Sequence, residues 1–149
     1  MRLAAIRPLL AWLALALPLH LAWEIAQLPL YTLWDDPNRV RVAAYVFHCI
    51  LGDVLLAGTT YLLSALLFRD FVWPTRRPWT AGGFMLAAGL GFTVFSEWGN
   101  VYVTGAWDYQ PTMPLVAGIG LTPLLQWVVV PTLMFLIVRR LPVFRTAAR

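Results

Sequence analysis

The sequence predicts an all-α integral membrane protein, a four-helix bundle that forms one domain across residues 1–149. Two observations carry this prediction. First, 60% of the 149 residues are hydrophobic and only 12% are charged, whereas about a quarter of the residues in a soluble domain are charged. Second, four long apolar segments alternate with short polar connections. This composition is typical of chains that cross a membrane several times.

Each predicted span has the length that a bilayer requires. Crossing ~30 Å of hydrocarbon takes about 20 helical residues. The segments that satisfy this are residues 8–31, 42–68, 80–103 and 113–138. The connections between them read WDDPNRVR, RDFVWPTRRPW and TGAWDYQPT. Their Pro, Asn, Asp and Gly residues favour turns, so we expect each span to pack against its neighbours in one domain.

Several features of the spans are expected to be structural. Gly83, Ala87 and Gly91 are small residues at a spacing of four, which predicts close helix packing along this stripe. Cys49 is expected to fill space. The WDY segment, residues 107–109, is expected to anchor the chain at the interface or to cover a pocket. Tryptophans placed as in an interfacial belt are Trp34, Trp73, Trp79 and Trp107.

The distribution of arginine predicts the orientation. All 11 cationic side chains are Arg, and nine of them lie at the termini or in the second connection. These nine are Arg2, Arg7, Arg69, Arg76, Arg77, Arg139, Arg140, Arg145 and Arg149. Because cytoplasmic loops retain positive charge, we expect both termini in the cytoplasm and the chain in the inner (plasma) membrane. The net charge of +4 would suggest nucleic acid in a soluble protein, but arginines at span ends indicate the lipid bilayer as partner, and no nucleic acid.

The first predicted span has an alternative interpretation as a cleaved signal peptide. Arg2 and Arg7 precede an apolar run, as in a secretory signal. Cleavage before Trp23 would place His20 where a small residue is preferred. We therefore favour an uncleaved span, and cleavage of residues 1–22 stays open.

Polar side chains interrupt each span in the half that faces outward. On the first span they recur at i, i+4, i+7 and i+11, which places them on one helical face. This stripe consists of His20, Glu24, Gln27 and Tyr31. The polar faces of the other spans contain Tyr45, His48, Cys49, Gly52 and Asp53, then Thr93, Glu97, Asn100 and Thr104, and then Gly118, Thr122 and Gln126. A charged carboxylate that faces lipid costs ~3 kcal/mol, so we expect the four faces to converge on one pocket.

Acids and histidines are the candidate catalytic residues of this pocket. We assign this role to Glu24, His20, Glu97 and Asp53, with Glu24 as the leading acid oriented by His20 one turn away. Tryptophan rings nearby would stabilise a cation. The candidate ligand-binding residues are Trp23, Gln27, Tyr31, His48, Asn100, Trp98, Gln126 and Trp127. Intramembrane amides and hydroxyls also serve as interhelical hydrogen-bonding groups, and this alternative stays open for the Asn, Gln and Thr residues.

Three classes of function fit such a pocket. The first is binding of a hydrophobic small molecule, such as a lipid, an isoprenoid or a sterol-like compound, with acid–base isomerase or cyclase chemistry. The second is a metal- or ion-handling protein, although the sequence contains no HExxH or ExxH motif, so no metal ligand or cofactor is assigned. The third is a non-catalytic subunit or assembly factor of a membrane complex, or a homo-oligomer, in which the polar faces are contact surfaces. The sequence leaves open whether the chain is an enzyme.

The segment EIAQLPLY, residues 24–31, is similar to a span with Glu and a QLP motif in four-helix sterol isomerase and sigma-2-receptor-like membrane proteins. The similarity covers about a dozen of the 149 residues and falls on the first span instead of the second. Its spacing from Glu to QLP also differs by one residue. No residue role is carried over from it.

Overall fold

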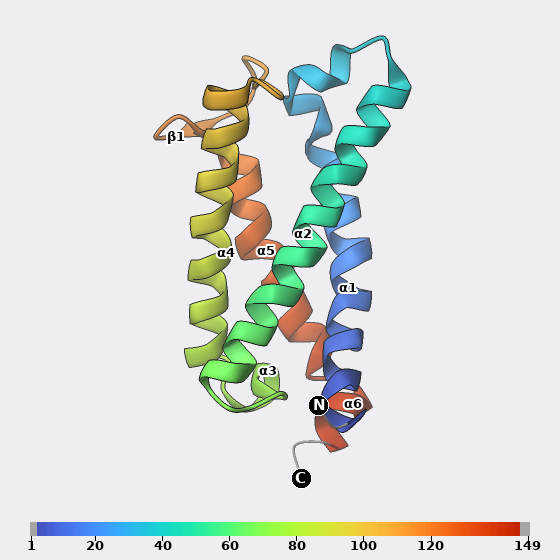
Figure 1. Ribbon diagram of the computed structural model, residues 1–149, viewed down its shortest axis with the longest axis vertical. Coiled ribbons are helices and arrows are strands. Elements are labelled where there is room, and N and C mark those ends of the chain that lie inside the picture. Colours follow the sequence, from blue (N-terminus) through green and yellow to red (C-terminus); the bar gives the residue numbers. More distant parts are fainter. Residues whose placement is uncertain (1–2, 147–149) are drawn as a thin grey trace.

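The computed structural model describes residues 3–146, with the side chains of residues 6–144, and it is mostly helical, as the sequence predicts. Four long helices run side by side along the molecule (Figure 1). They are α1 (Leu3–Gln27), α2 (Arg39–Leu67), α4 (Thr80–Trp98) and α5 (Leu121–Val138). The helices α2 and α5 each pack against both α1 and α4. The four helices therefore surround a common interior.

Short elements join the long helices at both ends of the molecule. In chain order they are the 3-10 turns η1 (Leu28–Leu30) and η2 (Thr32–Asp35), α3 (Trp73–Arg76), the π-helical turn η3 (Gly99–Thr104), the strands β1 (Leu115–Val116) and β2 (Ile119–Gly120), and α6 (Pro142–Thr146). Both chain ends lie at the α3 end of the molecule, and the strands lie at the opposite end (Figure 1).

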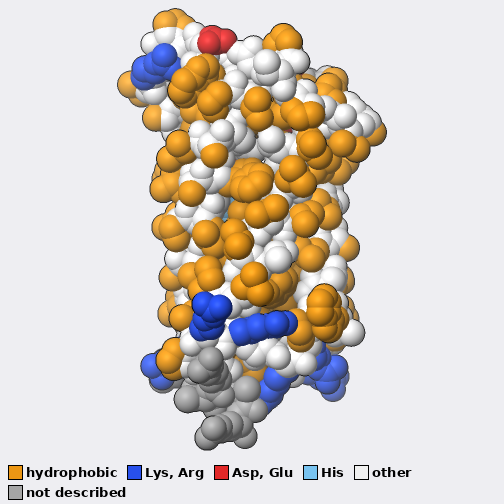
Figure 2. Space-filling model, turned by 180° about the vertical axis from the view of Figure 1, so that it is seen from behind, with side chains coloured by type: hydrophobic (Ala, Val, Ile, Leu, Met, Phe, Trp, Pro, Cys, Tyr) orange, Lys and Arg blue, Asp and Glu red, His pale blue; other side chains and the backbone are white. Residues whose placement is uncertain are grey.

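Three segments are long and apolar enough to cross a membrane, namely Ile6–Leu30, Arg39–Leu67 and Leu121–Val138. Large hydrophobic side chains are exposed on the outside of the helices, among them Leu17, Leu55, Leu63, Phe95 and Leu136. On the face drawn in Figure 2, a broad apolar band crosses the molecule, and most of the basic side chains gather at the end where the termini lie. Apolar surface of this extent indicates contact with lipid, and it supports a membrane protein.

The fourth long helix begins later than predicted, at Leu121 instead of Met113. Residues 115–120 form an antiparallel β-hairpin in place of the expected helical turns. Its turn residues Ala117 and Gly118 have φ values of 52° and 84°, and a two-residue hairpin loop with this backbone twist requires positive φ. Gly118 therefore lies outside the helix and does not belong to its polar face.

An aromatic core holds the helices together near the chain termini. Trp12 of α1, Tyr61 of α2 and Trp73 of α3 are fully buried, with ring centroids 5.5–5.9 Å apart. Nε1 of Trp73 donates a hydrogen bond to the backbone carbonyl of Tyr61 at 3.2 Å. The expectation that Trp73 belongs to an interfacial belt is therefore wrong, because α3 turns its ring into the core. Trp79, in contrast, is 88% exposed.

The helices α4 and α5 approach each other most tightly at Gly89, and not along the predicted glycine stripe. A Cβ atom on Gly89 would lie 2.2 Å from Cε3 of the Trp127 ring, so no larger residue fits there without displacing the ring. Gly83 and Gly91 would meet nothing within 4 Å, because they lie on the outer face of α4. The contact at Gly89 holds the Trp127 ring at the edge of a polar interior.

Candidate functional site

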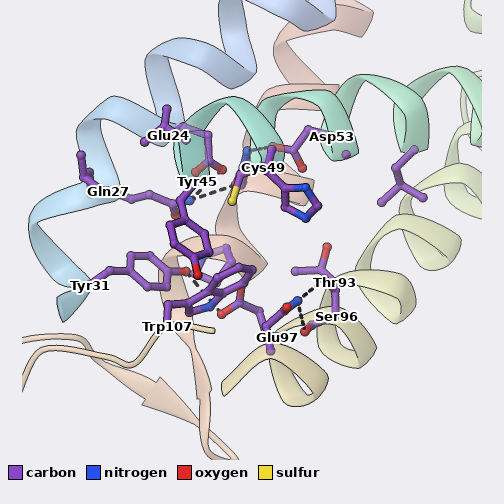
Figure 3. Close-up of a pocket in the computed structure, with 18 of the residues that line it drawn as sticks. Glu24, Gln27, Tyr31, Tyr45, Cys49, Asp53, Thr93, Ser96, Glu97 and Trp107 are labelled. Carbon is purple, nitrogen blue, oxygen red and sulfur yellow. Dashed lines mark hydrogen bonds between the residues drawn. The ribbon is translucent and has the colours of Figure 1, made fainter. Parts of the chain in front are cut away.

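A cavity of about 120 Å³ lies between the four long helices, toward the end opposite the chain termini. Carboxyl groups from three helices line it: Glu24 of α1, Asp53 of α2 and Glu97 of α4 (Figure 3). Aromatic side chains that share its wall are Tyr31, Tyr45, Phe92, Trp107 and Trp127. Within the described part of the chain, no Arg lines this cavity. The structure therefore brings together the three acids that the sequence places on separate helices.

Two glutamine side chains connect the acids of α1 and α2. Nε2 of Gln27 donates to Oε1 of Glu24 at 2.9 Å and to Oε1 of Gln126 at 3.3 Å. Nε2 of Gln126 donates in turn to Oδ2 of Asp53 at 2.8 Å. Both amides are buried, and buried polar networks whose members are paired are rigid. The two acids are therefore held in fixed positions relative to each other.

His20 lies beneath this network and has no exposed surface. Its Nδ1 atom is 2.9 Å from Nε2 of Gln126 and 3.5 Å from Oδ2 of Asp53. Because an amide N–H only donates, Nδ1 is the acceptor in the contact with Gln126. Among the described residues Nε2 has no hydrogen-bond partner. His20 and Asp53 thus share Gln126 as a partner. The predicted pairing of His20 with Glu24 is wrong, because Gln126 of α5 occupies the position beside the ring.

Glu97 is held by two tyrosines that lie beyond the long helices. The hydroxyl of Tyr109 donates to Oε2 of Glu97 at 2.6 Å, and the hydroxyl of Tyr31 lies 3.4 Å from the same oxygen. Tyr31 follows the end of α1 in extended conformation, yet its side chain still reaches the cavity. Burial, followed by the bond to Glu97, raises the pKa of Tyr109 above its ordinary value. Tyr109 therefore stays protonated, as a donor to the acid, far above neutral pH.

Backbone hydrogen bonds join the first and third connections over the cavity. The amide of Thr32 donates to the carbonyl of Asp108, and the amide of Gln110 donates to the carbonyl of Leu30, both at 2.9 Å. The WDY segment lies in this joined layer, and the ring of Trp107 lines the cavity (Figure 3). The sequence led us to expect that this segment anchors the chain at the interface or covers a pocket, and its position in the structure agrees with the second of these.

Most of the predicted site residues line the cavity. They are Glu24, Gln27, Tyr31, His48, Asp53, Glu97, Asn100, Gln126 and Trp127. Trp98 lies outside it and is 52% exposed, because successive helical residues point about 100° apart and Glu97 points inward. Trp23 stands behind the wall, where its Nε1 donates to Oε1 of Gln27 and to the carbonyl of Thr122, both at 3.2 Å.

Other residues at the cavity were not among the candidate catalytic or ligand-binding residues, although the sequence places Tyr45 on the polar face of the second span. Tyr45 and Trp107 line the cavity, and Tyr109 is the nearest donor to Glu97. The aromatic composition of the WDY segment was the available signal for two of them. Cys49 also lines the cavity; the sequence places it on the polar face of the second span as a residue that fills space.

The chemistry of this site is that of several carboxyl groups in apolar and aromatic surroundings. Such acids can donate and accept protons, and aromatic faces stabilise positive charge. Among the residues that the structure describes, no three His, Cys, Asp or Glu side chains are grouped so that they could hold a metal ion. No family model, curated protein or solved structure matches this chain.

Proposed function

We propose that the cavity binds a hydrophobic small molecule that carries or develops a positive charge, and that its acids exchange protons with that molecule. The observation that supports this most strongly is the meeting of Glu24, Asp53 and Glu97 in one largely apolar cavity without an Arg among its described lining residues. Acids removed from water require compensation. A positive centre in the ligand would balance the negative charge of the acids, and the rings of Trp107 and Trp127 stabilise the same positive charge.

The setting that we infer is a four-span protein of the inner (plasma) membrane with both termini in the cytoplasm. The packing of α4 against α2 and α5 supports a fourth span. Basic side chains gather at the end of the molecule where the termini lie (Figure 2), and this supports a cytoplasmic location for that end. Arg2 and Arg149, which contribute to the sequence prediction, lie outside the described residues. In this orientation the cavity opens in the outer half of the bilayer.

The reaction that these acids favour is isomerisation or cyclisation of an alkene by proton transfer. Glu24 and Asp53 line the same largely apolar cavity, so that one bound molecule can meet both acids. Protonated Glu24 gives its proton to a carbon–carbon double bond, which forms a C–H bond and a carbocation. Asp53 then takes a proton from a neighbouring carbon, and the electron pair of that C–H bond closes a new double bond. The proton passes from Asp53 back to Glu24, so no other reactant is consumed.

Mass spectrometry of apolar molecules that co-purify with the protein in mild detergent tests the proposal. We expect the wild type to retain a ligand and Glu24→Gln to lose it, because the amide neither ionises nor donates an acidic proton. The matched control is Asp108→Asn, which changes an exposed acid outside the cavity and should leave the ligand at the wild-type level.

Two results would replace this proposal. A stoichiometric metal found by elemental analysis and lost in Glu24→Ala or His48→Ala would indicate a metal- or ion-handling protein. The absence of both metal and ligand, together with a stable protein partner, would indicate a subunit or assembly factor of a membrane complex.

A further inference from the structure

The cavity is too small to enclose a whole isoprenoid or sterol-like molecule. Its volume is about 120 Å³, whereas pockets for drug-sized ligands measure about 300–1,000 Å³. A dry protein cavity of about 150 Å³ accommodates benzene. A molecule of the proposed class would therefore place only one end in the cavity and extend outward through an opening in its wall.

The exposed residues of the cavity wall mark where this opening lies. Among the described lining residues, the exposed ones are His48, Gly52 and Phe92. His48 and Gly52 lie one helical turn apart on α2, and Phe92, which is 50% exposed, lies on α4. We call the gap bounded by these three residues the α2–α4 opening.

The geometry of the two helices explains why this gap is not filled. Near the α3 end the helices are in contact, and Oγ of Ser64 on α2 donates to the carbonyl of Ala81 on α4 at 3.3 Å. Toward the cavity end α2 inclines away from α4 (Figure 1). At Gly52 an added Cβ atom would meet nothing within 4 Å. Diverging helices and a missing side chain thus leave the wall open at this point.

The surface around the α2–α4 opening is apolar. Leu51 and Leu55 on α2 are 47% and 61% exposed, and Phe95 on α4 is 66% exposed. Side chains of this kind on the outside of a membrane helix face hydrocarbon. In the membrane setting proposed above, the opening therefore leads into the bilayer.

The path from the cavity to the aqueous side is closed by side chains. A second, polar hollow lies over the connections and contains Asp36 and Arg41. Leu33, Tyr45 and Trp107 line both this hollow and the cavity, so they form the wall between the two. The rings of Tyr45 and Trp107 meet edge to face, with centroids 6.3 Å apart. Water-borne ligands would have to displace this aromatic contact.

We propose that the α2–α4 opening is a lateral portal, through which one end of an elongated apolar molecule passes from the bilayer into the cavity while the remainder stays in lipid. This inference rests on the proposed function and adds the class of ligand. That class is a molecule with a long chain or ring system that ends in a small group able to carry or accept a proton.

Photolabelling of the protein in lipid vesicles tests the portal. Two phenyl-sized diazirine probes are compared, an uncharged one dissolved in the bilayer and a sulfonated one dissolved in water. Mass spectrometry measures labelling of Glu24 and Glu97, which are only 9% and 8% exposed. Gly52→Trp places a ring in the opening, and Phe92→Ala removes one. Gly83→Trp is the matched control, because Gly83 is also exposed and unobstructed but lies away from the cavity.

We expect the uncharged probe to label Glu24 and Glu97 in the wild type. Labelling should fall several-fold in Gly52→Trp, rise in Phe92→Ala and stay unchanged in Gly83→Trp. Stronger labelling by the sulfonated probe, or equal labelling of the wild type, Gly52→Trp and Phe92→Ala, would overturn the portal while leaving a co-purifying ligand unaffected. If the labelling follows the expected pattern but the purified wild type retains no ligand, the portal stands and the proposed function is overturned. If Gly52→Trp does not fold, the change in labelling of Glu24 and Glu97 in Phe92→Ala decides between the presence and the absence of a portal.

Discussion

The hydroxyl of Tyr109 donates a hydrogen bond of 2.6 Å to Oε2 of Glu97. This bond joins the connection that covers the cavity to an acid that lines it. A donor directed at a buried carboxyl oxygen stabilises that oxygen and restricts its orientation. This contact therefore couples the cover of the cavity to the position of its third acid.

Tyr109→Phe should destabilise the protein by about 1–3 kcal/mol, because it leaves a buried carboxyl oxygen without its nearest donor. The matched control is Tyr102→Phe. Tyr102 donates to the carbonyl of Gly118 at the same distance, 2.6 Å, but it is 55% exposed, so its loss should cost less than about 1 kcal/mol. Thermal unfolding in detergent micelles measures both variants. Equal losses of stability in Tyr109→Phe and Tyr102→Phe would show that the bond to Glu97 contributes no more than an exposed hydrogen bond.

The stability of the wild type should fall more steeply than that of Tyr109→Phe as the pH rises above about 10. The pKa of Tyr109 is raised in the folded protein by burial and by the bond to Glu97. A raised folded pKa contributes stability that is fully present below the unfolded pKa of about 10 and is lost as the pH rises through the folded value. Unfolding curves recorded across the alkaline range measure this difference. Parallel pH profiles for the two proteins would contradict the expectation.

Gly89→Ala should destabilise the protein by about 1–3 kcal/mol, as overpacking of a close contact does, since the new Cβ atom would lie 2.2 Å from the Trp127 ring. Gly91→Ala is the control, because its Cβ atom would meet nothing within 4 Å. That change should be neutral or stabilise the helix by up to about 1 kcal/mol. Thermal unfolding of both variants, followed by tryptophan fluorescence, separates a packing effect from helix propensity. A similar gain in stability at both positions would show that α4 and α5 do not meet at Gly89.

Gln126→Leu should destabilise the protein by about 3 kcal/mol, because it removes a partner from two buried polar groups and one partly buried group at about 1–3 kcal/mol each. These groups belong to His20, Asp53 and Gln27. Gln110→Leu removes a comparable bond, from Nε2 of Gln110 to Asp35 at 2.5 Å, but in an exposed setting. It should cost less than about 1 kcal/mol. Denaturation of both variants in the same detergent compares the two losses, and equal costs would contradict a buried network.

The sequence predicted the helices because the length of an apolar segment indicates a membrane span, and it predicted the acids that meet because periodicity places them on one face of each helix. Apolar segments of sufficient length predict membrane helices, and α1, α2 and α4 overlap the predicted spans closely. Glu24 and Gln27 are three residues apart on α1, so they share one face of this helix whichever helix packs against it. The acids of three helices then meet because the interior is the place where their burial costs least.

The specific partners could not be predicted, because they depend on how each helix is rotated and how far it is shifted along its neighbour. His20 is one turn from Glu24 on α1, but the structure places it beside Gln126 of α5. Tyr109 reaches Glu97 only because two connections fold over each other. The late start of α5 has the same cause, because the hairpin that contains Gly118 depends on backbone angles that hydropathy does not encode.

The most direct test of the central claim compares a cationic and a neutral form of one apolar molecule. N,N-Dimethylgeranylamine is protonated at neutral pH, and geranyl methyl ether has a similar size and the same chain without the charge. Titration of the protein in nanodiscs, followed by native mass spectrometry, gives the Kd of each. We expect the amine to bind at least about tenfold more tightly, which corresponds to about 1.4 kcal/mol. We also expect the double variant Glu24→Gln, Asp53→Asn to lose this preference while it binds the ether as before. Equal affinities in the wild type would contradict the claim that the cavity acids bind a positive centre. A preference for the amine that survives in the double variant would contradict the claim that Glu24 and Asp53 bind that centre.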